Sequence, residues 1–159
     1  MRALALPRRP LSLYLIQRAD SRGDYDCAVV CCESADAAKQ LQDWTADPVA
    51  IEVERLGIAA PRVPRGIVCL ACPTLLCQQA PSQQINSLYL IERTDPLGYW
   101  QYDHVVVCCE SADAARQTQP EAHTENGRGW TDNLHLLDVQ LLGTAVPRLC
   151  RGIVCALYC

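Results

Sequence analysis

The chain contains the same stretch of sequence twice. The repeated segments are residues 13–16 with 88–91 (LYLI), 31–38 with 108–115 (CCESADAA), and 65–69 with 151–155 (RGIVC). Because this is a tandem duplication, the fold has to be worked out for one unit before it is worked out for the chain. Each unit has roughly 70 residues, a size at which one hydrophobic core is barely sufficient. We therefore expect the two units to pack on each other.

The duplication also predicts the domain boundaries. The first unit covers residues 1–72, with an N-terminal arm at 1–11, and the second unit covers 88–159. Residues 73–87 between them are rich in Pro, Gln and Ser, which is typical of a linker. The second copy also contains a polar stretch at 120–129 that has no counterpart in the first. Since insertions are tolerated in loops, we expect this stretch to be an inserted loop.

Hydrophobic patterning predicts four strands and one helix in each unit. The expected strands are residues 13–17, 26–32, 51–56 and 67–71, and then 88–92, 103–109, 137–142 and 153–158. Ser34 and Ser111 stand where a helix N-cap belongs, each before an alanine-rich segment. The second strand of each unit is apolar on both faces, so it should be buried from two sides. The predicted fold class is α+β: two tandem β-β-α-β-β units, each an antiparallel sheet with one short helix, packed as a pseudo-twofold body.

Composition narrows the classes of function. The formal net charge is −4, which disfavours nucleic acid as a partner because binding to a phosphate backbone depends on Lys and Arg. No stretch approaches the roughly 20 apolar residues of a membrane span. The apolar run near the N-terminus is also too short for a secretory signal. We therefore predict a cytoplasmic protein that does not bind membranes.

The 11 cysteines allow three interpretations. Cys69, Cys72 and Cys77 have a spacing from which a thiolate zinc site could be built. The second copy does not keep this spacing, because its terminal pair is Cys155 and Cys159. Disulfides are the second interpretation, and they are rare in a cytoplasm. The third interpretation is that the cysteines are small buried hydrophobic side chains. We expect reduced cysteines that fill the core as small hydrophobic side chains, with no metal and no cofactor.

Catalytic signatures are missing from both copies. The sequence contains no nucleophile elbow, Walker A loop, zincin helix or dinucleotide fingerprint. His104 follows Asp103 directly, but neighbours on a strand point to opposite faces, so we do not expect an Asp–His relay. The sequence therefore predicts a protein that is not an enzyme and has no catalytic residue.

Arginines in a repeated loop are the most suggestive polar groups. The candidate ligand-binding residues are Arg62, Arg65, Arg148 and Arg151, with Tyr25, Tyr102, Trp44 and Trp130. Guanidinium groups next to backbone amides suit a phosphate or carboxylate, and aromatic rings could stack on a base. The alternative is that the arginines form surface ion pairs with Glu52, Glu54 or Asp138 while the tryptophans fill the core.

The second copy also resembles a known family. It carries Tyr-Leu-Ile-x-Arg-x-Asp at 89–95, Tyr-Asp at 102–103, Val-Val before Glu-Ser at 110–111, Trp130, Gly-x-Ala at 143–145 and Gly-Ile-Val at 152–154. This set of residues resembles a family of small, largely uncharacterised phage and bacterial proteins. The resemblance implies a viral setting and supplies no reaction, cofactor or active site.

Three classes of function remain. The leading prediction is a non-enzymatic, phage-encoded protein-interaction or virion-associated structural module, which binds another protein or associates with itself in the host cytoplasm or the virion. Duplication favours this class because it doubles a surface without needing new chemistry. The first alternative is a small-ligand binder that sequesters an anionic nucleotide signal. The second alternative is a metal or redox protein that uses its cysteines.

Overall fold

The computed structural model describes most of both copies. The described residues are 10–18, 27–41, 51–71, 85–96, 102–118, 120, 130–131 and 133–158. Most of the predicted N-terminal arm (1–9), linker (73–84) and inserted loop (121–129) lies outside these ranges. Among the described residues, no helix is long and apolar enough to cross a membrane.

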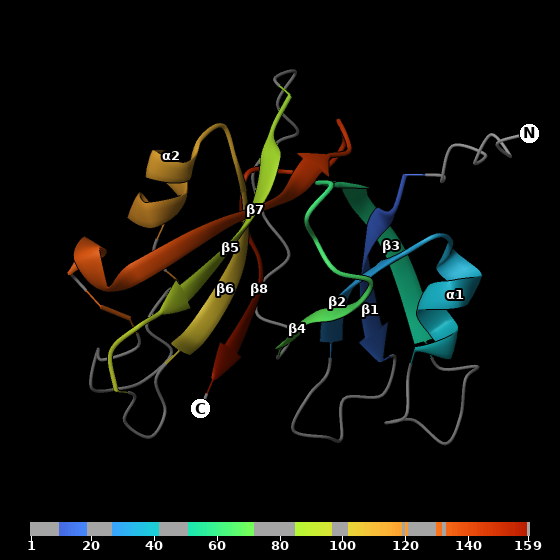
Figure 1. Ribbon diagram of the computed structural model, residues 1–159, viewed down its shortest axis with the longest axis horizontal. Helices are drawn as coiled ribbons and strands as arrows, with labels where there is room; N and C mark the ends of the chain where they lie inside the picture. Colours follow the sequence, from blue (N-terminus) through green and yellow to red (C-terminus); the bar gives the residue numbers. More distant parts are fainter. Residues whose placement is uncertain are drawn as a thin grey trace, which may run out of the picture.

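The described residues form eight strands and two short α-helices (Figure 1). In chain order the elements are β1 (Ser12–Arg18), β2 (Cys27–Cys32), α1 (Ala35–Gln40), β3 (Ile51–Ala59), β4 (Gly66–Ala71), β5 (Ser87–Arg93), β6 (Tyr102–Cys109), α2 (Ala112–Gln117), the 3₁₀ helix η2 (Leu134–Leu136), β7 (Leu137–Ala145) and β8 (Gly152–Tyr158). All eight described strands belong to one sheet with the order β4-β2-β1-β3-β7-β5-β6-β8. Every neighbouring pair is antiparallel.

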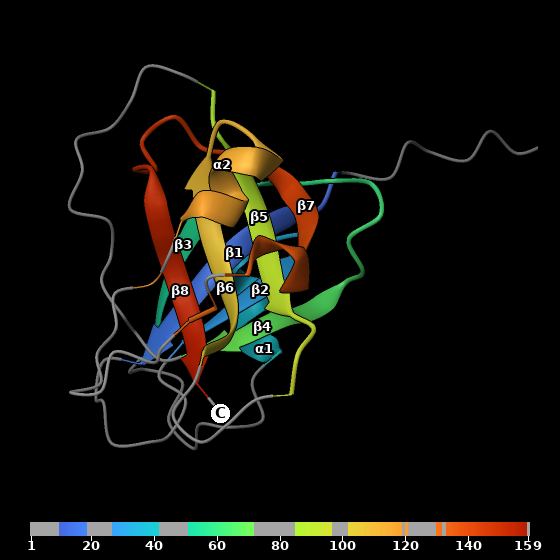
Figure 2. The same ribbon diagram turned by 90° about the vertical axis from the view of Figure 1, so that its left-hand side faces the viewer.

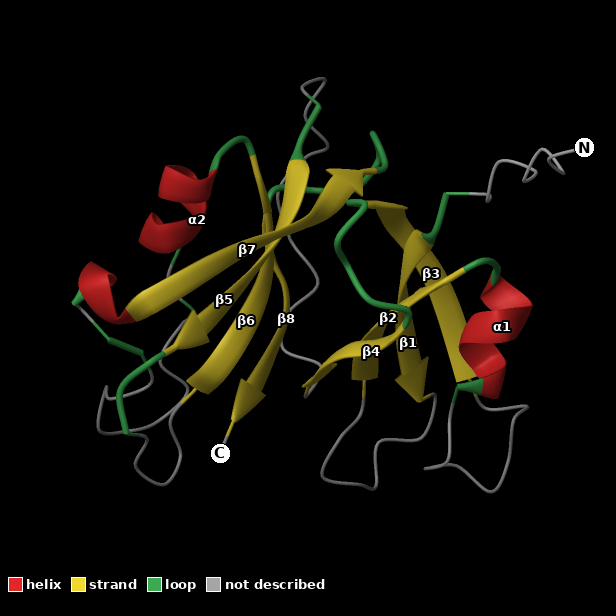
Figure 3. Cartoon of the chain, viewed as in Figure 1, coloured by secondary structure: helices red, strands yellow, loops and turns green. Residues whose placement is uncertain are grey.

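The predicted fold class is therefore wrong. The chain does not form two α+β units that each have a sheet of their own, because β3 of the first half pairs with β7 of the second. The described part of the molecule is mostly antiparallel sheet, and its helices are only short additions (Figure 3). Hydrophobic patterning shows which face of a strand is buried but not which strand edges pair, so this joint could not be predicted from the repeat.

Two glycines allow β3 and β7 to pair closely. A Cβ atom on Gly57 would collide with the carbonyl oxygen of Thr144, and a Cβ atom on Gly143 would collide with that of Ile58. Backbone hydrogen bonds of 2.7 Å flank the joint, from Ala60 N to Leu142 O and from Val146 N to Leu56 O. The two halves are thus joined by backbone pairing as well as by side chains.

The sheet folds back on itself at this joint, so that two four-stranded arms face each other (Figure 1). The core between the arms contains buried side chains of both halves, such as Leu15 and Val29 from the first and Leu90 and Val106 from the second. The edge strands β4 and β8 lie in contact at the open end. We call the space between the arms the shared core.

Each helix covers the outer face of its own arm. Figure 2 shows α2 lying over β5 and β6, which it contacts, and α1 contacts β1 and β2 in the same way. The predicted N-caps are confirmed, since Ser34 and Ser111 each accept a backbone hydrogen bond of 3.1 Å. All six residues of β2 are buried, because the shared core lies on one face and α1 on the other. The prediction that this strand is buried from two sides is confirmed.

Candidate functional site

Thiol and imidazole groups meet in the shared core near the contact between the edge strands. They come from four strands: Cys27 on β2, Cys69 on β4, His104 on β6 and Cys155 on β8. The Cys69 side chain interacts with His104 and with Cys155, and the Cys155 side chain also interacts with Cys27. We call these four residues the seam cluster. It is a chain of contacts that runs from one arm of the sheet to the other.

Asp103 completes the arrangement on the far side of the imidazole. His104 Nδ1 lies 3.2 Å from Asp103 Oδ2, so the ring can donate a hydrogen bond to the carboxylate. The prediction that the side chains of these strand neighbours point to opposite faces is wrong. It assumed a regular strand, whereas the register of β6 against β8 shifts between Tyr102 and His104. An irregularity of this kind re-aims a side chain and removes the strict alternation of faces.

Electrostatics in the seam cluster favour a charged pair. The pKa of the Cys69 thiol is lowered to about 6, chiefly by the hydrogen bond with Cys155; burial opposes this, and the hydrogen bond and charge of His104 add to it. Burial acts to lower the pKa of His104, but its interactions with Cys69 and Asp103 outweigh burial and raise it. Both shifts favour a thiolate at Cys69 beside an imidazolium at His104, the form in which cysteine is nucleophilic.

Cys155 is in the opposite state. Its pKa is raised well above the usual value by its hydrogen bonds with Cys27 and Cys69, by complete burial, and by the negative charge on Cys69. Cys155 is therefore a thiol where Cys69 is a thiolate. The seam cluster contains one nucleophile and one protonated neighbour that donates a hydrogen bond to it.

Access to the seam cluster is narrow. Cys69 is 2 % exposed, whereas the side chains of His104 and Asp103 are 16 % and 34 % exposed. Solvent therefore reaches the site on the side of the imidazole and the carboxylate. A reactant for Cys69 has to be small.

Comparison of the two halves shows how the seam cluster arises. Cys27 and His104 occupy equivalent places, because they pair with equivalent residues of β1 and β5. Cys69 and Cys155 are equivalent in the same way. A comparison of equivalent positions in the repeat could have drawn attention to His104, since the first copy has a cysteine there. The sequence could not show that the two pairs meet, because this depends on the folding back of the sheet.

The burial predicted for the cysteines is confirmed for those that the structure describes. Among the described cysteines none forms a disulfide, and all are buried except Cys150, which is half-buried. No group of three or more His, Cys, Asp or Glu side chains within the described ranges is arranged to hold a metal ion. Of the candidate zinc ligands, Cys69 lies in the shared core, while Cys72 and Cys77 lie outside the described residues.

The repeated arginines form ion pairs at equivalent places in the two halves. Arg65 Nη1 lies 3.0 Å from Glu33 Oε1, and Arg151 pairs with Glu110. Each arginine precedes a glycine with a positive φ, 127° at Gly66 and 123° at Gly152. The carboxylate partners are thus not the Glu52, Glu54 or Asp138 named from the sequence. Arg62 and Arg148 are exposed.

The two candidate aromatic residues that the structure describes, Tyr102 and Trp130, do not lie beside Arg151. Tyr102 and Trp130 contact each other edge to face, with ring centroids 6.5 Å apart, in the hydrophobic cluster beneath α2. Tyr102 begins β6, while Gly152, next to Arg151, pairs near its other end. At about 3.3 Å per residue these ends are roughly 20 Å apart. Tyr25 and Trp44 lie outside the described residues.

Arg151 also lines a pocket, together with residues of β6 and α2. The pocket has a volume of about 340 Å³, and Glu110, Gln117 and Thr118 contribute its polar side chains. The Arg151 guanidinium is already paired with one of these residues, Glu110. A small anion would therefore have to compete with a carboxylate for the same positive charge.

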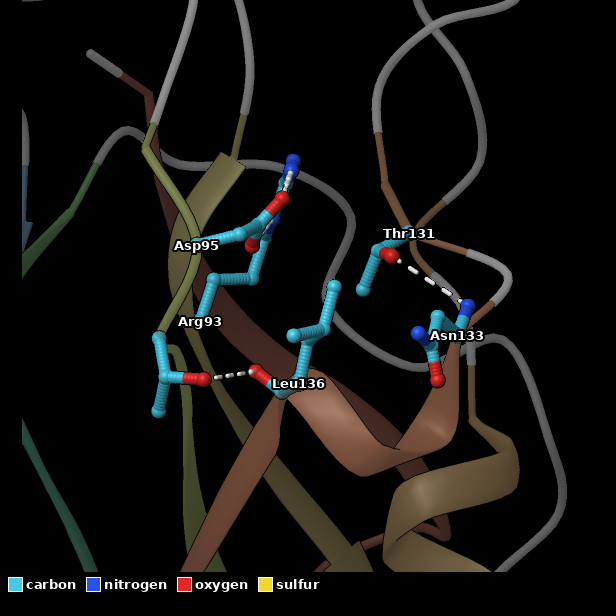
Figure 4. Close-up of polar contacts among 6 residues, drawn as sticks. Arg93, Asp95, Thr131, Asn133 and Leu136 are labelled. Atoms are coloured by element: carbon cyan, nitrogen blue, oxygen red, sulfur yellow. Dashed lines mark hydrogen bonds and ion pairs between the residues drawn. The ribbon is translucent and has the colours of Figure 1, made fainter.

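A further polar group fastens the end of β5 to η2 (Figure 4). Arg93 Nε donates to Asp95 Oδ1 at 2.9 Å, a second bond joins Nη2 to Oδ2, and the Thr94 hydroxyl donates to the Leu136 carbonyl at 3.1 Å. The hydrogen bond with Arg93 also lowers the pKa of Asp95. The Arg side chain is only 5 % exposed, and bidentate charged pairs are strong. This Arg-x-Asp segment is therefore a structural fastening.

Comparison with known proteins gives no match. No protein-family model matches the chain, and neither a curated protein nor a solved structure matches it. The seam cluster is the arrangement among the described residues with the most definite chemistry.

Proposed function

We propose that the protein is a thiol-based redox protein in which Cys69 is the reactive group. The observation that carries this proposal is the contact between Cys69 and His104, whose ring is held by Asp103. A nucleophile, an imidazole and an orienting carboxylate form the arrangement that activates a cysteine. This proposal replaces the predicted non-enzymatic module with the redox alternative because of the chemistry of the seam cluster. The contacts that form this cluster join distant strands, and the sequence did not reveal them.

The substrate class follows from access and from the setting of the thiolate. Cys69 is almost fully enclosed among hydrophobic side chains, so an acyl substrate, which needs a cleft and donors for an oxyanion, fits poorly. A small hydroperoxide fits better. The Cys69 thiolate attacks the terminal peroxide oxygen and the O–O bond breaks. The alkoxide or hydroxide that leaves takes the proton of the His104 imidazolium.

This step balances in atoms and electrons. The sulfur of Cys69 loses two electrons and becomes a sulfenic acid, while the peroxide gains two and leaves as an alcohol or water. His104 is left neutral. The residues have distinct roles: Cys69 is the nucleophile, His104 stabilises the thiolate and supplies a proton, and Asp103 positions the ring.

The proposal is tested by titrating Cys69 in the full-length protein. The thiolate absorbance that is lost in Cys69→Ser should titrate with a midpoint near pH 6, and hydrogen peroxide consumption should rise through the same pH range because only the deprotonated form attacks. His104→Gln should raise the midpoint by the part of the shift that His104 contributes, since Cys155 remains in place, and so slow consumption at pH 7.

A matched control is the same substitution at another histidine. His135 lies exposed in η2, so His135→Gln should leave the midpoint and the rate unchanged. An ordinary midpoint for Cys69, with peroxide consumption no faster than in Cys69→Ser, would overturn the proposal.

A second candidate function is protein binding through self-association. Ile58 and Leu141 on the central strands are 47 % and 49 % exposed. Leu141 lies opposite Tyr89, which packs against the cluster beneath α2, so it is on the outer face. Sedimentation velocity over a range of concentrations tests this candidate. Self-association that Ile58→Asp with Leu141→Asp removes would support it, and a wild-type protein that stays monomeric would eliminate it.

A further inference from the structure

We propose that Cys155 attacks oxidised Cys69, so that a reversible disulfide between these residues fastens β4 to β8 and closes the open end of the folded sheet. This inference rests on the proposed function, because it begins from oxidised Cys69. It adds a second reactive residue and a structural consequence of the reaction.

The position of the two cysteines in the sheet carries the inference. β4 and β8 are the two edge strands of the sheet, and they contact each other. Cys69 lies opposite Val29 of β2, and Cys155 lies opposite Val106 of β6, both in the shared core. Their side chains interact, and both pack in the same hydrophobic cluster. Since no strand lies between them and neither outer edge is paired within the described sheet, the strands can adjust to the length of a disulfide.

Attack by Cys155 follows the oxidation of Cys69 because oxidation removes the negative charge of Cys69. While Cys69 is a thiolate, its negative charge helps to keep Cys155 protonated. A sulfenic acid carries no such charge, so oxidation of Cys69 makes deprotonation of Cys155 easier. The Cys155 sulfur then attacks the sulfur of Cys69, the S–O bond breaks, and the leaving hydroxide takes the proton of Cys155 and departs as water.

Reduction returns the site to its starting state. Two equivalents of a small-molecule thiol convert the Cys69–Cys155 disulfide to two cysteines and are themselves oxidised to a disulfide. The complete cycle thus consumes one hydroperoxide and two thiols. No group other than these reactants has to supply or accept electrons.

Cys27 is a second cysteine beside Cys155, so the proposed Cys69–Cys155 disulfide has to be distinguished from a disulfide that contains Cys27. Cys27 contacts Cys155, but it lies on β2, which is already hydrogen-bonded to β4. A bond between Cys27 and Cys69 would link strands that are paired and would not close the sheet. Because Cys27 belongs to the seam cluster, the matched control for Cys155 is Cys32, a buried cysteine of β2 that packs beneath α1 and whose loss should leave the closing disulfide intact.

The experiment treats the reduced full-length protein with hydrogen peroxide and maps disulfides by mass spectrometry without reduction. We expect a Cys69–Cys155 linked peptide and a rise in melting temperature on the order of 10 °C, because the bond closes a long loop. Dithiothreitol should reverse both. Cys32→Ser should keep the bond and the rise, whereas Cys155→Ser should lose both and accumulate oxidised Cys69.

The outcomes separate this inference from the proposed function. If wild-type Cys69 is oxidised to sulfenic or sulfinic acid while Cys155 stays a thiol, the inference is overturned and the proposed function stands. A disulfide from Cys155 to Cys27 instead of Cys69 also overturns it. If peroxide does not oxidise Cys69 at all, the proposed function fails, and the inference fails with it. These readings come from wild-type protein and do not depend on the folding of a variant.

Discussion

At the scale of single residues, one difference between the copies distinguishes two equivalent thiols. Cys69 and Cys155 occupy matching places on the edge strands, yet Cys69 contacts His104 and Cys155 contacts Cys27. Each of the two thiols has a cysteine neighbour, but only Cys69 also has an imidazole beside it, and an imidazolium stabilises a thiolate. The reactive cysteine is therefore determined by what stands at the equivalent positions 27 and 104.

Exchanging these two residues should move the reactive thiol. In the double variant Cys27→His with His104→Cys, the imidazole stands beside Cys155, and the sequence also places an aspartate, Asp26, before position 27. We expect the pKa of Cys155 to fall and that of Cys69 to rise toward its usual value. Peroxide labelling followed by mass spectrometry measures which sulfur is oxidised at pH 7.

The single variant His104→Cys is the control for this exchange. It removes the imidazole without supplying another, so neither edge-strand cysteine should be oxidised quickly at neutral pH. Continued oxidation of Cys69 in the double variant would show that His104 does not determine its reactivity.

At the scale of elements, the pairing of β3 with β7 places the two arms against each other. The helices contribute little of their own, since six residues form a stable helix only when capped and packed, as Ser34 and Ser111 cap them here. The strands β2 and β6 have no exposed residue, so they depend on both the helix and the opposite arm. The close pairing of β3 with β7 at Gly57 and Gly143 therefore helps to keep every inner strand buried.

Adding a side chain at either glycine of the joint should destabilise the protein. Gly57→Ala and Gly143→Ala each bring a methyl group against a carbonyl of the facing strand, and relieving such a collision costs about 1–3 kcal/mol of unfolding free energy. Urea unfolding measures this loss. Thr144→Val, at an exposed position on the same strand, should change stability by less than about 0.5 kcal/mol. Unchanged stability in both glycine variants would mean that the strands need no such close approach.

At the scale of the whole molecule, the sequence predicts the parts better than their assembly. The strand expected at 26–32 is β2 at Cys27–Cys32, and both serine caps are found where they were expected. These features depend on local patterns of apolar and capping residues. The single sheet and the seam cluster depend instead on contacts between distant segments, such as Cys69 with His104. A local pattern does not contain that information.

The shared core predicts what happens when the first half of the chain is produced without the second. Inner side chains of each half, such as Leu15 and Leu90, are buried in a core to which both halves contribute. Residues 1–80 alone would expose this face. At roughly 25 cal/mol per Å², a few hundred Å² of newly wet apolar surface costs several kcal/mol, comparable with the stability of a domain. We therefore expect the isolated first half to unfold or to associate, as measured by urea unfolding and sedimentation.

Cutting the chain without separating its halves provides the contrasting case. A protease site placed within residues 73–84 breaks the covalent connection but removes no residue of the shared core. The nicked protein should keep both fragments together and retain most of its unfolding free energy, because backbone pairing at the joint and the core itself are intact. If residues 1–80 are instead monomeric and as stable as the whole chain, the halves are independent domains. The burial of Leu15 and Val29 against the second half would then contribute nothing to their stability.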